Sequence, residues 1–90
     1  PELKIPVQEG EQYAFIEKFV GQAKFEGARI ATIDGLRVDW PDGWGLVRAS
    51  NTTPVLVLRF DAKDEAALDR IKAVFREQLL ATDPSLQLPF

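Results

Sequence analysis

The sequence predicts an α+β fold: a small antiparallel β-sheet of four main strands plus a short N-terminal strand, with two helices packed on one face. Short runs of β-forming residues, bounded by turn residues, indicate the strands. Two longer stretches repeat apolar residues at helical spacing. The order is strand, helix, four strands, helix, and an antiparallel sheet can bury both helices on one face. Ninety residues are enough for a single domain, residues 1–90.

The first two elements are a short strand and a helix. Leu3, Ile5 and Val7 alternate with polar residues or proline, which is typical of a half-buried strand, and Pro6 suits the edge of a sheet. A helix is predicted from about Gly10 to Ala23. Its apolar positions are Phe15, Ile16, Phe19, Val20 and Ala23.

Four strands follow, separated by turn residues. The pair Asp34-Gly35, a strong hairpin signal, divides the first two strands. Pro41-Asp42-Gly43 has the composition of a turn and precedes the third strand. The predicted strands are Ala28–Ile33, Leu36–Trp40, Trp44–Ala49 and Pro54 to about Phe60. The last is apolar on both faces from Val55 to Leu58, so we expect it inside the sheet.

The final element is a helix from about Asp64 to Ala81, with Asp61 or Asp64 as its N-cap. Its predicted buried stripe consists of Leu68, Ile71, Phe75 and Leu79. Thr82-Asp83-Pro84 ends the helix, because the residue before proline disfavours helical backbone. We expect the tail beyond it to be loosely held.

Composition excludes several classes of function. The chain has no cysteine and no histidine, so it lacks a thiolate nucleophile and the commonest metal ligands and general base. No two carboxylates form a convincing catalytic pair, so we predict neither catalytic residues nor a metal site. A net charge of −3 argues against nucleic acid as a partner, and no stretch is apolar enough for a membrane span. Without a membrane span or a signal-peptide pattern, we expect a cytoplasmic location. We also expect a piece of a longer parent chain, since the sequence begins with Pro1 and contains no methionine.

Five polar side chains stand just before the fourth strand: Arg48, Ser50, Asn51, Thr52 and Thr53. Residues of these types are common in turns, where their side chains bond to nearby backbone groups, so composition alone favours a solvated hairpin turn. The alternative is an anion site. Arg48 has a bidentate guanidinium, and the four residues after Ala49 offer hydroxyl, amide and backbone donors.

Residues 37–60 also carry a resemblance to a known family. The stretch "RVDWPDGWGLVRASNTTPVLVLRF" resembles the C-terminal domain of bacterial phosphomannomutase/phosphoglucomutase enzymes, in the α-D-phosphohexomutase superfamily. The resemblance extends from about residue 3 to residue 90. Glucosamine mutases of this superfamily typically carry Ser-Gly-Thr-Glu-Pro in the loop, whereas this chain has Ser50-Asn51-Thr52-Thr53-Pro54, the phosphomannomutase/phosphoglucomutase form.

The resemblance implies a TBP-like domain, the fourth of four around a deep cleft, that closes over a phosphosugar. In such enzymes a phosphoserine exchanges phosphoryl groups with hexose 1- and 6-phosphates, and Mg²⁺ is bound by another domain. The fourth domain holds the phosphate that is not being transferred. Carried onto this chain, the substrate phosphate-binding residues are Arg48, Ser50, Asn51, Thr52 and Thr53. The expected partners are a phosphosugar and the other domains of the parent enzyme.

Two other functions are alternatives. The first is a ligand-free α+β protein-interaction module, in which the loop is only a turn. The second is an RNA-binding sheet, which the acidic charge and the lack of interleaved basic and aromatic residues disfavour.

Three further side chains have open roles. If the turn is centred near Asn51-Thr52, Arg59 lies opposite Trp44 or Gly45, where we expect it to pair with Asp61 or Asp39; a positive surface toward the cleft is the alternative. Trp40 and Trp44 are expected to pack in the core or on the sheet, with stacking on a sugar as the alternative.

Overall fold

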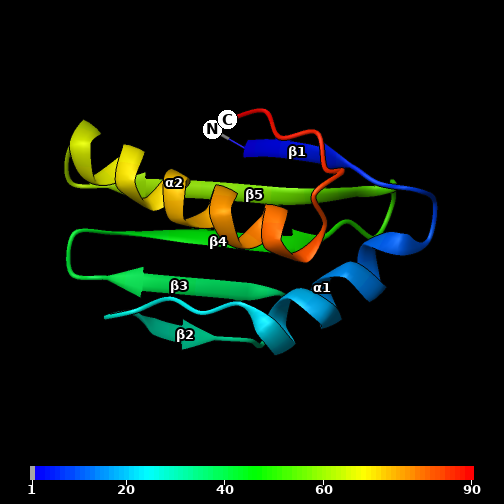
Figure 1. The fold of residues 1–90 in the computed structure, drawn as a ribbon, viewed down its shortest axis with the longest axis horizontal. Helices are drawn as coiled ribbons and strands as arrows, with labels where there is room; N and C mark the ends of the chain where they lie inside the picture. The colour runs from blue at the N-terminus through cyan, green and yellow to red at the C-terminus, as the bar shows by residue number, and fades with distance from the viewer. Residues whose placement is uncertain (1) are drawn as a thin grey trace.

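A computed structural model describes residues 2–90 as one antiparallel sheet with two helices on the same face (Figure 1). The strands lie in the order β1-β5-β4-β3-β2. The strands are β1 (Glu2–Pro6), β2 (Arg29–Ala31), β3 (Leu36–Trp40), β4 (Gly43–Ala49) and β5 (Val55–Ala62), and the helices are α1 (Glu11–Gln22) and α2 (Glu65–Thr82). The predicted fold class is confirmed. The strand β1, with Pro6, is at an edge, and β5 is inside the sheet between β1 and β4, both as predicted.

The core lies between the helices and the inner face of the sheet. Phe19 of α1 and Ile71, Phe75 and Leu79 of α2 are fully buried. They pack over the inward-facing residues of the strands, which include Ile5, Val38, Val47, Leu56 and Leu58. Gly45 provides the space for the Phe75 ring, since a Cβ atom at this position would lie 2.5 Å from Phe75 Cε1. The helix stripe predicted from periodicity is therefore the one that packs on the sheet, although Leu68 is only partly buried.

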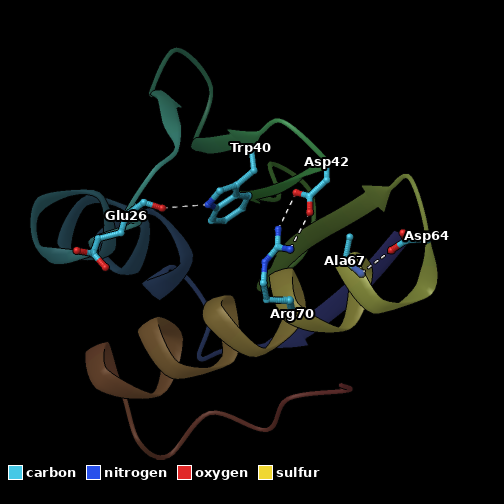
Figure 2. A network of polar contacts seen from close by, with 6 residues as sticks. All are labelled: Glu26, Trp40, Asp42, Asp64, Ala67 and Arg70. Carbon is cyan, nitrogen blue, oxygen red and sulfur yellow. Dashed lines mark hydrogen bonds and ion pairs between the residues drawn. The ribbon is translucent and has the colours of Figure 1, made fainter.

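Polar contacts hold α2 against the turn between β3 and β4 (Figure 2). Arg70 donates two hydrogen bonds to the carboxylate of Asp42, at 2.7 and 2.6 Å. These bonds to the guanidinium hold the pKa of Asp42 below its ordinary value. Of the two predicted caps, Asp64 is the one used: its side chain accepts a hydrogen bond of 2.8 Å from the backbone N–H of Ala67.

Trp40 belongs to the core. Its ring packs edge-on against Phe25 and Phe75, with centroid distances of 5.9 and 6.5 Å. Its indole Nε1 donates to the backbone carbonyl of Glu26 at 3.1 Å (Figure 2). The expectation that Trp40 packs in the core is confirmed.

The tail after α2 is not loosely held, so that prediction was wrong. Leu86, Leu88 and Phe90 pack against the core, and the Phe90 ring lies edge-on to Phe60 with a centroid distance of 5.3 Å. Arg76 also donates to the backbone carbonyl of Phe90 at 3.0 Å. These three apolar residues alternate with residues 87 and 89, so one side of an extended segment can cover the core.

Strand lengths differ slightly from the expected ones. The strand β2 has only three residues, against six predicted, and the connection from β2 to β3 spans residues 32–35. The shortest strand is therefore β2 and not the N-terminal strand.

Neither helix in the part of the chain that is described combines the length and apolar character that a membrane span requires.

Candidate functional site

The polar segment singled out in the sequence forms the connection between β4 and β5. The ladder ends at the pair Ala49 and Leu56, and the backbone N–H of Ser50 donates to the carbonyl of Val55 at 3.1 Å. The connection is therefore a five-residue loop, Ser50–Pro54, at one end of the sheet. We refer to Ser50–Thr53 as the SNTT loop.

Ser50 organises the SNTT loop from inside. It is buried, with 8% of its surface exposed, and its Oγ accepts hydrogen bonds from the backbone N–H groups of Thr52 and Thr53, both at 3.3 Å. The Ser50 hydroxyl also lies 3.2 Å from Thr53 Oγ1. Asn51, Thr52 and Thr53 are exposed. The loop thus presents side-chain donors on the outside of a turn that Ser50 holds together.

Arg48 lies at the base of the loop, on the sheet face away from the helices. It pairs with Val57 of β5, and Lys4 of β1 is the partner of Val57 on the other side, so both cations lie in one cross-strand row. Arg48 is half-buried and takes part in no ion pair within residues 2–90. No carboxylate in the described chain neutralises the Arg48 guanidinium. An anion bound at this end of the sheet could therefore form an ion pair with it.

Two residues of α1 contact the loop, and sequence reasoning missed both. Gln12 is buried, and its Nε2 donates to the backbone carbonyls of Ser50 at 3.1 Å and Thr53 at 3.2 Å. The Tyr13 hydroxyl donates to Asn51 Oδ1 at 2.9 Å. A signal for Gln12 was present, because it lies seven residues before Phe19, on the buried stripe of α1, where an amide needs a polar partner. Tyr13 is exposed and gave no such signal.

The expected pairing of Arg59 with Asp61 or Asp39 is wrong. Because the loop has five residues, the turn is centred one residue later than assumed, and Arg59 lies opposite Leu46 instead of Trp44 or Gly45. Asp39 is bound by Arg37, and Arg59 has no ion pair in the described chain.

Trp44 lies on the open face of the sheet, on the same side as Arg48. The guanidinium carbon of Arg37 is 4.4 Å from the centroid of its ring. Trp44 is therefore a sheet-packing residue, as expected, and not part of the core.

Family comparison agrees with this geometry. Residues 2–78 match the family described as "Phosphoglucomutase/phosphomannomutase, C-terminal domain". The chain belongs to this family. The matched region contains the whole sheet, the SNTT loop, Arg48 and most of α2.

Relatives of the phosphoglucomutase/phosphomannomutase family match the full chain. A phosphomannomutase/phosphoglucomutase of Pseudomonas aeruginosa is 58% identical over 90 residues, which are 100% of this chain and 19% of that protein. A phosphoglucomutase of Neisseria gonorrhoeae is 52% identical over 99% of this chain and 20% of its own length. The solved structure of a phosphoglucomutase/phosphomannomutase family protein from Burkholderia thailandensis superposes with a TM-score of 0.89, at 52% identity, over 100% of this chain and 19% of that one. The chain thus spans about a fifth of the length of these relatives.

Proposed function

We propose that this chain is the C-terminal domain of a longer phosphomannomutase/phosphoglucomutase that interconverts hexose 1-phosphate and hexose 6-phosphate. In this proposal the SNTT loop and Arg48 bind the substrate phosphate that is not being transferred, and the domain closes the cleft over it. Membership of the family and the fraction of each relative that the chain spans support the proposal. A cytoplasmic location stays a prediction.

The observation that carries the proposal is the arrangement at the end of β4. Three exposed polar side chains of the loop follow a half-buried arginine that no acid neutralises. A phosphate at the loop would accept hydrogen bonds from neutral donors and a charge-assisted bond from Arg48. Arg48 is the one cation within residues 48–53, and a single cation at the loop suits an anion that must be released again, because several cations would bind it more tightly.

The proposal assigns only binding to this domain. No group of three or more acidic side chains within residues 2–90 is arranged to hold a metal ion, so the described residues do not fit Mg²⁺. In the proposal, the metal and the phosphoserine expected from the family resemblance belong to other domains. The contribution of this chain is to anchor one end of the substrate while the other end reacts.

The test is a titration of the isotopically labelled chain with inorganic phosphate, followed by amide NMR shifts at constant ionic strength. We expect shifts clustered at residues 48–53, with a dissociation constant in the millimolar range, because the loop is open to water in the isolated domain. Chloride at equal ionic strength is the control. An absence of clustered shifts at high millimolar phosphate would favour the alternative, a ligand-free protein-interaction module.

A further inference from the structure

Asn51 is held by a residue far away in sequence. Its Oδ1 accepts the 2.9 Å hydrogen bond from the Tyr13 hydroxyl, and its amide nitrogen forms no hydrogen bond within residues 2–90. A carboxamide is planar, with the oxygen and the nitrogen on opposite branches. When Tyr13 holds the oxygen, the NH₂ group points away from α1 and is available to a ligand.

Gln12, the residue before Tyr13, holds the loop in place relative to α1. Both of its Nε2 hydrogen bonds go to loop carbonyls, so the loop backbone is tied to the first turn of α1. Its Oε1 is buried and has no partner in the described chain. Burying this oxygen without a hydrogen bond destabilises the fold, and an apolar side chain at position 12 would avoid that cost. The structural role of Gln12 is therefore the pair of hydrogen bonds that its Nε2 donates to the loop.

We propose that Tyr13 is a positioning residue of the phosphate-binding loop, which orients the Asn51 amide so that its NH₂ group faces the bound phosphate. This inference rests on the proposed function of the loop. Without the hydroxyl, the last torsion of Asn51 is free to populate two orientations, since such torsions are broad and nearly two-fold. In one of them the carbonyl oxygen would face the phosphate and repel it.

The expected effect is moderate, because Tyr13 acts through one neutral hydrogen bond. A net contribution of that size corresponds to a change in affinity of about two- to tenfold. The Tyr13→Phe variant removes a single oxygen atom from a side chain that is 51% exposed, so we expect the fold to be unaffected. Ser85→Ala is the matched control, because it also removes one exposed hydroxyl that donates to an acceptor, the carboxylate of Asp83.

The experiment compares phosphate affinity by NMR titration of five proteins: wild type, Tyr13→Phe, Asn51→Ala, the double variant and Ser85→Ala. We expect a two- to tenfold weaker affinity for Tyr13→Phe and no change for Ser85→Ala. In the Asn51→Ala background, Tyr13→Phe should have no further effect, because the amide that it orients is gone. The side-chain NH₂ signals of Asn51 should also move in Tyr13→Phe without phosphate.

The outcomes separate the two proposals. If the wild type shows no shifts at residues 48–53, the proposed function fails and the positioning role fails with it. If the wild type binds and Tyr13→Phe binds equally well, only the positioning role is overturned. An equal loss from Tyr13→Phe in both backgrounds would also overturn it, since Tyr13 would then act independently of Asn51. Melting curves of all five proteins show whether any loss of affinity comes from unfolding.

Discussion

Gly35→Ala should disturb Arg48 through the backbone. Gly35 immediately precedes β3 and has a φ of +83°, in the left-handed region. A Cβ atom there would collide with the carbonyl oxygen of Val47 and lie 2.8 Å from both Cα and Cβ of Arg48. Backbone atoms cannot move aside as a flexible side chain can, so β3 and β4 would have to separate at this end. Arg48 would then shift away from the loop.

Two costs add up in this variant. Left-handed backbone costs alanine about 1–2 kcal/mol, and forcing an extra carbon into a packed site costs about 1–3 kcal/mol. Gly27→Ala separates the two, because Gly27 has a similar φ of +71° and nothing lies within 4 Å of its added Cβ. We therefore expect Gly35→Ala to be less stable than Gly27→Ala by about 1–3 kcal/mol. For a domain of this size, that is a melting temperature lower by roughly 4–24 °C.

The assay is thermal unfolding of the wild type, Gly27→Ala and Gly35→Ala, followed by phosphate titration below the melting transition. Gly35→Ala should also bind phosphate more weakly than Gly27→Ala, because only the first variant displaces Arg48. The reasoning is refuted if Gly35→Ala melts no lower than Gly27→Ala. Equal phosphate affinities, with the expected difference in melting temperature, would show that Arg48 does not move with the strand.

Three further predictions follow from the proposed function and the fold. In the full-length mutase, Arg48→Ala should lower kcat/KM by roughly ten- to hundredfold, because a charge-assisted bond in a closed cleft contributes about 1.5–3 kcal/mol. Arg48→Lys should restore only part of this, since lysine lacks the bidentate fork, and steady-state kinetics with a melting control would show it. The isolated 90-residue chain should fold but not interconvert glucose 1-phosphate and glucose 6-phosphate, and any turnover in a coupled assay would contradict this. Because Arg70 lowers the pKa of Asp42 in the folded state, the unfolded state binds more protons as the pH approaches 3.8, and the stability from this pair declines as the pH falls. The difference in melting temperature between wild type and Asp42→Asn should therefore be present at neutral pH and shrink as the pH falls below 3.8, because the lowered pKa of the Asp42 carboxyl is then approached; a difference that stays constant as the pH is lowered would disprove the role of the pair.

The sequence alone determined the elements, the fold class and the candidate loop. Strands and helices were readable because side-chain direction repeats locally, every two residues in a strand and about every 3.6 in a helix. The buried Ile71, Phe75 and Leu79 of α2 follow directly from that spacing. The candidate loop could also be predicted from local sequence, because Arg48 and the SNTT loop lie within six consecutive residues.

The tertiary structure alone decided which distant residues meet. Gln12 and Tyr13 contact a loop 38 or more residues away, and Arg70 reaches Asp42 across 28 residues. Such partners depend on how α1 and α2 settle on the sheet, and no local pattern encodes that placement. The pairing of Arg59 with Asp39 was misjudged because the register of β4 and β5 is shifted by two residues from a turn centred at Asn51-Thr52, so Arg59 lies opposite Leu46 and not opposite Trp44, the neighbour of Asp39. The tail was misjudged because its apolar residues pack on a surface that exists only after β5 and α2 have assembled.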